Sequence, residues 1–129
     1  MKGVLLVVCG LFALNLQAQV FVAKKNINVL KIQYIEVWDK FQGTEGVYYA
    51  MVDYGQKDDP TDLEGHQLRI TSKKGSTSRF NSIVEILNFL DENGWELIQI
   101  REIGKYESSY LMRKKKSDMN GLVDSSIEN

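Results

Sequence analysis

Short apolar runs, rich in β-branched and aromatic side chains, predict strands in the central part of the chain. Residues 29–41 (VLKIQYIEVWDKF) and 47–54 (VYYAMVDY) are two such runs, and their composition is typical of β-structure. The two glycines within residues 42–46 predict a hairpin turn between them. A polar loop over residues 55–65 follows, and then a third, short strand is predicted over residues 68–71.

The alternation of apolar and polar positions in the first of these strands is imperfect. Leu30, Ile32 and Trp38 share one parity, whereas Ile35 and Val37 have the other. Two interpretations are open. Either a β-bulge shifts the register within the strand, or both faces of the strand are partly covered.

The pattern then changes to that of a helix. Ser82 with Glu85 three residues later is a capping box, and Gly94 suits the left-handed position that ends a helix. The apolar stripe between them has the i, i+3, i+4, i+7 spacing of one buried face. It comprises Ile83, Ile86, Leu87 and Leu90. Two more strands are predicted, over residues 95–103 and 108–113.

The predicted order βββαββ indicates an α+β domain over residues 29–116. Because short turns favour antiparallel pairing, we expect one antiparallel sheet of four to five strands with the helix packed on one face. The other face is then solvated or covered by a partner. Residues 19–28 lead into the domain, and residues 117–129 lack an apolar period and are predicted to be a disordered tail.

The first 18 residues have the layout of a secretory signal peptide. Lys2 precedes an apolar run over residues 3–14, and a more polar stretch over residues 15–19 follows. The run is shorter than the roughly 20 residues of a membrane-spanning helix, so the structural alternative is a buried N-terminal helix. We expect cleavage after Ala18 and export by the general secretory route. The mature protein would be periplasmic or extracellular, with no transmembrane segment left after cleavage.

Cysteine content and charge exclude several kinds of function. The only cysteine, Cys9, lies in the predicted leader, so the mature chain has no disulfide, thiol nucleophile or zinc–thiolate site. Lipid attachment at Cys9 is disfavoured because Val8 stands where lipoprotein signals place a small residue. The formal net charge of −1 provides no field that would attract nucleic acid. We expect no nucleic-acid partner and no cofactor.

Three short motifs carry a resemblance to a known group of proteins. They are DYGQ at residues 53–56, FNSIVEILNF at 80–89 and GWEL at 94–97. With these motifs the chain resembles small exported bacterial proteins of unknown function and, more loosely, the GWEL-type domains of unknown function. The resemblance covers residues 47–116 and implies a fold but no activity. In physical terms, Trp95 can fill the gap beneath the helix end, so Trp95 and Leu87 are predicted to be folding residues.

The acidic loop offers the main candidates for catalysis or metal binding. Its carboxylates, weak candidates for calcium ligands, are Asp58, Asp59, Asp62 and Glu64. Their spacing is not that of an EF-hand, and a solvated loop made polar by turn chemistry around Pro60 is the favoured interpretation. His66, the only histidine, could form a hydrolytic triad only with a serine such as Ser72, Ser76 or Ser78.

The aromatic residues of the predicted strands are the candidates for binding. Adjacent Tyr48 and Tyr49 must point to opposite faces of a regular strand, and aromatic side chains are enriched in interfaces. The candidate binding residues are Trp38, Tyr48, Tyr49 and Tyr54. The sequence thus favours a non-enzymatic binding or interaction module of the cell envelope, with an unidentified protein or glycan partner. The alternative is a small hydrolase or a calcium-dependent domain that uses the acidic loop 58–64.

Overall fold

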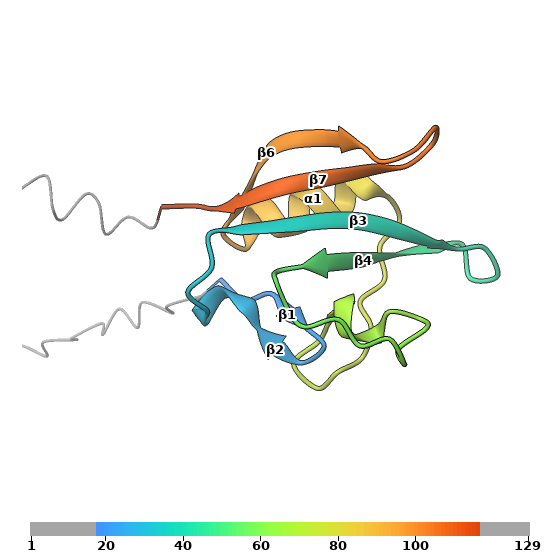
Figure 1. The fold of residues 1–129 in the computed structure, drawn as a ribbon, viewed down its shortest axis with the longest axis horizontal. Helices are drawn as coiled ribbons and strands as arrows, with labels where there is room; N and C mark the ends of the chain where they lie inside the picture. Colours follow the sequence, from blue (N-terminus) through green and yellow to red (C-terminus); the bar gives the residue numbers. More distant parts are fainter. Residues whose placement is uncertain (1–17, 117–129) are drawn as a thin grey trace, which may run out of the picture.

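The computed structural model of the protein describes residues 18–116. The predicted leader up to residue 17, with Cys9, and the predicted tail 117–129 lie outside the described residues. Along the chain the structure has the following elements, shown in Figure 1: β1 (Phe21–Val22), β2 (Lys25–Asn26), the 3-10 helix η1 (Ile27–Val29), β3 (Tyr34–Gln42), β4 (Val47–Asp53), the 3-10 helix η2 (His66–Leu68), β5 (Ile70–Thr71), α1 (Ile83–Glu92), β6 (Trp95–Glu102) and β7 (Ser108–Lys114).

The strands form two antiparallel sheets, not one. The larger sheet has the order β4-β3-β7-β6 and the smaller has the order β2-β1-β5. The α+β class is therefore confirmed, but the single sheet with the order βββαββ is not. The predicted third strand, β5, pairs with β1, with Phe21 opposite Thr71. β1 and β2 arise from the leading segment 19–28, where strands of two residues are too short to show a period.

The imperfect alternation predicted for the first long strand has a simple explanation. β3 begins only at Tyr34, so Leu30 and Ile32 precede it and pack against the core from an irregular segment. The pairing of β3 with β4 and β7 runs without a register shift. Ile35 and Val37 are buried on one face and Trp38 is partly covered on the other. Both faces of the strand are thus partly covered, and the irregularity that the structure does contain lies in β6, between Leu97 and Gln99.

The helix has the predicted boundaries. Ser82 Oγ accepts a hydrogen bond from the Glu85 amide at 3.2 Å, but the Glu85 carboxylate accepts from Asn81 N at 2.8 Å and not from the cap residue itself. Gly94 has φ +92°, the left-handed conformation that glycine adopts without strain. In the part of the chain that the structure describes, no helix is long and apolar enough to cross a membrane.

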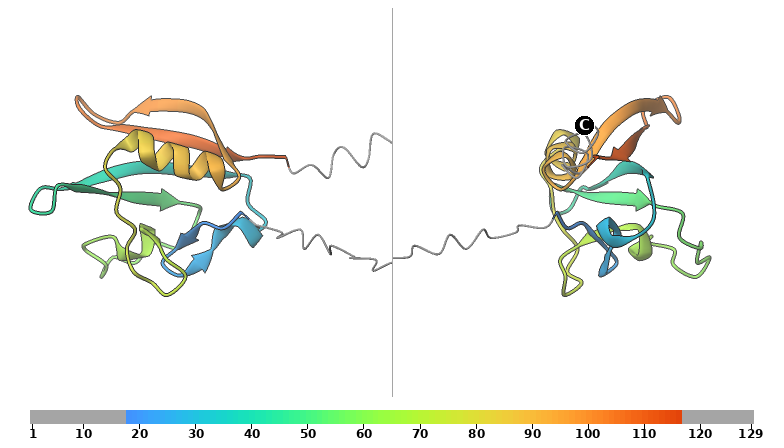
Figure 2. Two further views of the ribbon diagram at one scale, coloured as in Figure 1. Left: turned by 180° about the vertical axis from the view of Figure 1, so that it is seen from behind. Right: turned by 90° about the vertical axis from the view of Figure 1, so that its left-hand side faces the viewer.

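The core lies between α1, one face of the larger sheet and the smaller sheet. Figure 2 shows α1 against this face, with the smaller sheet beyond β4. Leu90 and Trp95 are completely buried, and so are Val20, Val22 and Ile27 from the leading segment. The segment 19–28 is therefore part of the packed domain. Leu87 is only partly buried, so the centre of the helix stripe is Ile86 and Leu90.

Candidate functional site

The face of the larger sheet that α1 leaves uncovered is organised around Trp38. Side chains alternate along β3, so Trp38 points away from α1 while its neighbour Val37 points into the core. Its cross-strand partner on β4, Met51, shares this outer face but is buried. A Cβ added to Gly65 would lie 2.8 Å from Met51 Cε, so the chain before η2 covers Met51. Trp38 itself remains partly exposed.

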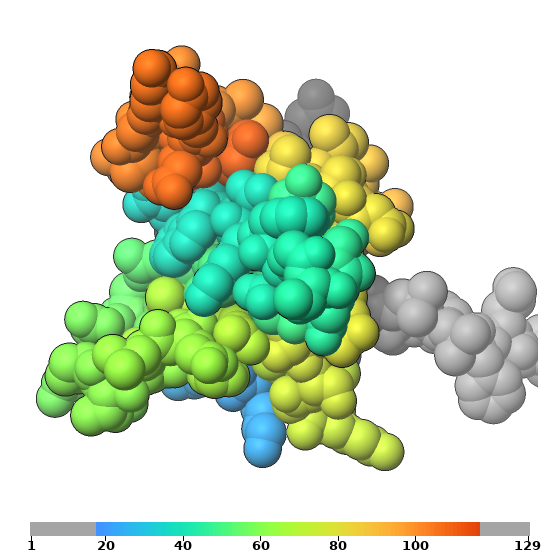
Figure 3. Space-filling model, turned by 90° about the vertical axis from the view of Figure 1, so that its right-hand side faces the viewer, coloured from blue at the N-terminus to red at the C-terminus, as the bar shows by residue number. Residues whose placement is uncertain are grey.

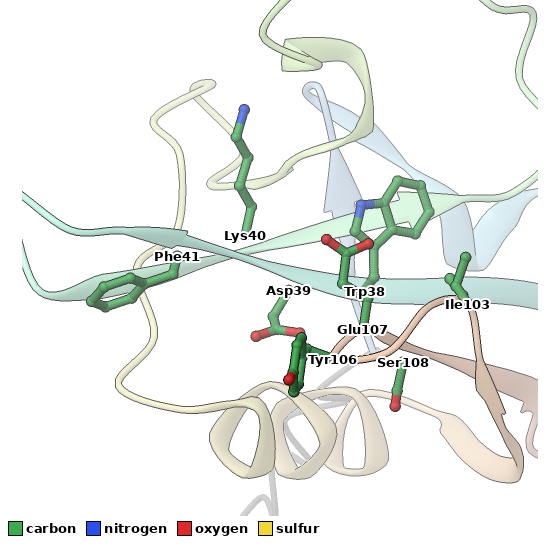
Figure 4. A pocket seen from close by; sticks show the side chains of 8 residues that line it. All are labelled: Trp38, Asp39, Lys40, Phe41, Ile103, Tyr106, Glu107 and Ser108. Carbon is green, nitrogen blue, oxygen red and sulfur yellow. The ribbon is translucent and has the colours of Figure 1, made fainter.

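A first hollow opens where two neighbouring strands separate. β3 pairs with β4 as far as Gln42 but with β7 only over Tyr34–Val37, so the second half of β3 has a free edge. The gap beside it has a volume of about 390 Å³. Its lining, shown in Figure 4, comes from β3 and from the β6–β7 turn: Trp38, Asp39, Lys40, Phe41, Ile103, Tyr106, Glu107 and Ser108. In Figure 3 the β6–β7 turn and the β3–β4 turn project at the same end of the molecule, with a depression between them.

A second hollow is also lined by Trp38. It has a volume of about 180 Å³. It is lined by Trp38, Asp53, Gln56, Asp58, Gln67 and Leu68. Trp38 is thus the one residue that lines both of these hollows.

The two hollows carry an excess of negative charge. Their linings include four carboxylates, those of Asp39, Glu107, Asp53 and Asp58, and one ammonium group, that of Lys40. The Lys40 Nζ atom lies 3.5 Å from the carbonyl oxygen of Glu64, so part of its hydrogen-bonding capacity is used within the protein. An aromatic ring flanked by carboxylates attracts positively charged groups.

The four aromatic residues predicted to bind a ligand lie in different environments in the structure. Tyr48 and Tyr49 point to opposite faces, as predicted, because Tyr48 packs against the core while the Tyr49 ring lies 4.8 Å beneath the Arg69 guanidinium. Tyr54 also packs against the core. Of the four, only Trp38 lines either of the two hollows described above.

Sequence reasoning missed several residues of the first hollow. Phe41, Ile103 and Tyr106 all line it and are all more than half exposed. Tyr106 lies in the short turn between two predicted strands, and a large aromatic residue at such a position is the signal that could have identified it. The separation of β3 from β7 had no counterpart in the sequence pattern.

The carboxylates of the acidic loop stabilise the loop itself. Asp59 Oδ1 accepts hydrogen bonds from Thr61 N at 2.9 Å and from Thr61 Oγ1 at 2.6 Å. Asp62 Oδ2 accepts from Gln67 N at 2.8 Å. Among residues 18–116 there is no group of three acidic or histidine side chains that could hold a metal ion. The geometry therefore offers no support for a calcium site in the loop.

His66 has a carboxylate at each ring nitrogen. Its Nδ1 lies 3.1 Å from Asp62 Oδ1, and its Nε2 lies 3.3 Å from Glu64 Oε2. In a hydrolytic triad the second nitrogen would face a serine hydroxyl. Here Glu64 occupies that position, so the arrangement lacks the nucleophile that the hydrolase alternative requires.

The loop is expected to lose its ordered conformation in acid. The side-chain and backbone hydrogen bonds from Thr61 lower the pKa of Asp59, and the backbone hydrogen bond from Gln67 lowers the pKa of Asp62. Because each folded-state pKa lies below the ordinary value of about 4, these carboxylates stabilise the loop above that pH. The stabilisation is lost as the pH falls through the lower, folded-state pKa.

The titration can be followed by NMR through the amide protons of Thr61 and Gln67. We expect both to move with midpoints below the ordinary aspartate range, and Asp62→Asn to abolish the transition at Gln67 alone. A Gln67 midpoint at or above that range would contradict the assignment.

Comparisons of the chain with protein-family models, with curated proteins and with solved structures found no match. The resemblance drawn from the short motifs therefore stays a prediction, and the function has to be argued from the geometry around Trp38.

Proposed function

We propose that this protein is an exported, non-enzymatic binding module of the cell envelope that holds its ligand across Trp38. The observation that carries the proposal is that Trp38 is partly exposed and lines both hollows. Tryptophan contributes a large contact area at low entropic cost and is enriched among residues that dominate binding energy. Export rests on the layout of the leader.

The charge of the hollows supports a positively charged ligand. Their four carboxylates outnumber the single ammonium group of Lys40, and an arginine or lysine side chain over the Trp38 ring would gain a cation–π contact of about 0.5–2 kcal/mol. Two hollows that share Trp38 suit neighbouring side chains of one extended chain. We infer that the ligand is a basic peptide segment of another envelope protein.

The test measures peptide affinity by isothermal titration calorimetry with matched variants. The probes are a peptide rich in arginine and lysine and a glutamate-rich peptide of equal length. We expect the basic peptide to bind, with an affinity that falls as salt is added, and Trp38→Ala to weaken binding by about 30-fold, the loss typical of a central aromatic contact.

Tyr34→Ala is the control. Tyr34 is an exposed aromatic residue of the same strand and the same face, but it lines neither hollow. We expect its removal to leave the affinity within about twofold. Equal affinity of the Trp38→Ala variant and the unchanged protein would refute the site. Trp38-dependent binding of a neutral glycan, with none of the basic peptide, would refute the ligand class.

A further inference from the structure

One edge of the larger sheet is left open. The order β4-β3-β7-β6 places β4 and β6 at its two edges. The β4 edge is covered, because Tyr48 N and O form hydrogen bonds of 2.8 and 2.9 Å with Phe80, and Met51 bridges to Arg69. Within residues 18–116, no strand pairs with the outer side of β6.

The open strand is long and exposes several apolar side chains. β6 has eight residues, and Leu97, Ile98 and Ile100 are 43%, 43% and 56% exposed. Proteins ordinarily protect such an edge, because its unpaired N–H and C=O groups can pair with another strand. We propose that β6 pairs antiparallel with β6 of a second copy of this chain, joining the two larger sheets into one.

The bulge between Leu97 and Gln99 shifts the alternation of β6, so it decides which side chains share a face. Leu97 and Ile100 lie opposite Met112 and Tyr110 of β7, which pack against the core, so both belong to the face that α1 covers. Glu96 and Arg101 lie opposite Arg113 and Ser109 and belong to the outer face. Leu97 and Ile100 therefore lie on the α1 face and Glu96 and Arg101 on the outer face, whereas Glu102, opposite Ser108, shares the α1 face near the end of the strand.

One register of a twofold symmetric pair matches the central side chains on both faces. If Leu97 lies opposite the partner's Ile100, symmetry repeats this apolar pair and places Glu96 opposite the partner's Arg101. A shift by one residue in one direction would instead place Glu96 opposite the partner's Glu102, where like charges repel. A shift by one residue in the other direction would place Glu96 opposite the partner's Ile100, which belongs to the other face. A shift by two residues places Glu96 opposite an uncharged side chain. Among the registers within two residues of the first, only the first places Glu96 opposite a positive charge.

The same register continues a row of charges already present in each copy. Arg101 Nη1 lies 3.2 Å from Glu36 Oε1, and the Arg113 guanidinium donates to Glu96 Oε1 at 2.8 and 3.0 Å. Across the pair, the signs alternate from Glu36 through Arg101 to the partner's Glu96 and the partner's Arg113. A row of this kind stabilises neighbouring strands and disfavours other registers.

Sedimentation and light scattering of residues 19–129 test the proposal. We expect a concentration-dependent dimer. Glu96→Arg and Arg101→Glu each place like charges opposite each other, so each variant alone should dimerise at least about tenfold more weakly. An equimolar mixture of the two variants restores opposite charges at both pairs, so we expect it to dimerise again, as a heterodimer. Circular dichroism checks that both variants are folded.

The mixture separates pairing between copies from effects within one copy. Each variant keeps its altered contact with its own Arg113 or Glu36, so recovery in the mixture can come only from contacts across the pair. Lys105→Glu, a charge reversal in the β6–β7 turn, should leave dimerisation unchanged. A monomer at all concentrations would overturn the proposal. Failure of the mixture to dimerise would also overturn it. The same holds if residues 19–129 stay monomeric while residues 19–116 dimerise, because the C-terminal segment of the same copy would then be the occupant of the β6 edge.

Discussion

Replacing Trp95 by alanine is expected to lower the free energy of unfolding by about 3–5 kcal/mol, the cost of removing a large buried aromatic side chain. Trp95 is completely buried at the start of β6. Its Nε1 donates to Asn28 Oδ1 at 3.4 Å, and Lys114 Nζ lies 5.5 Å from its ring centroid. The alanine variant leaves a cavity and removes contacts with the leading segment and with β7 at once.

Denaturant unfolding measures this effect, and Trp95→Phe is its matched control. Phenylalanine keeps an aromatic ring in the cavity and removes only the Nε1 hydrogen bond and part of the volume, so we expect it to cost about half as much. A loss below about 1 kcal/mol for Trp95→Ala would contradict the role of this side chain in the core.

The second large effect is expected at Leu90. Leu90 is completely buried on the inner face of α1, so Leu90→Ala should lower the free energy of unfolding by about 2–5 kcal/mol. Leu87→Ala deletes the same atoms from the same helix, but Leu87 is only partly buried, so its cost should be about 1–2 kcal/mol.

Val84→Ala provides the exposed reference in this series. Val84 is 60% exposed on α1, and its replacement should change stability by no more than about 0.5 kcal/mol. Denaturant unfolding of the three variants should therefore rank Leu90 above Leu87 and Leu87 above Val84. A larger loss at Leu87 than at Leu90 would show that a different face of α1 packs against the sheet.

The two proposals concern separate parts of the larger sheet and can fail independently. The peptide test depends on Trp38 in β3, and the dimer test depends on the outer edge of β6. If both hold, pairing at an edge keeps the same faces of the two sheets on the same side. The dimer would then present two Trp38 sites in one direction, which favours a partner that carries repeated basic segments.

Local features of this protein were predictable because each rests on a few neighbouring residues. The start of α1 at Ser82 and its end at Gly94 follow from the backbone groups that a helix leaves unpaired and from the left-handed conformation that glycine tolerates. The hairpin at residues 42–46 and the opposite orientations of Tyr48 and Tyr49 follow in the same way from turn geometry and strand alternation.

The division into two sheets was decided by contacts between distant segments. Residues 21–22 and 70–71 form strands of two residues each, so neither has a period of its own to be recognised. They pair because Val22 and Ile70 are both buried in the core. Likewise Asn28, an ordinary polar residue in the sequence, accepts from Val20 N at 2.9 Å and donates to Asn93 O at 2.8 Å, joining the leading segment to the end of α1.

The candidate site shows the same division between sequence and tertiary structure. The sequence alone determined that the strands of this small domain carry more aromatic side chains than one helix can cover. It also identified Trp38 as one of them. Only the tertiary structure decided that Tyr48 and Tyr54 serve the core, that Arg69 covers Tyr49, and that β3 and β7 separate to open the hollow beside Trp38. A strand's alternation specifies which side chains share a face, but the path of its neighbour depends on packing across the whole sheet.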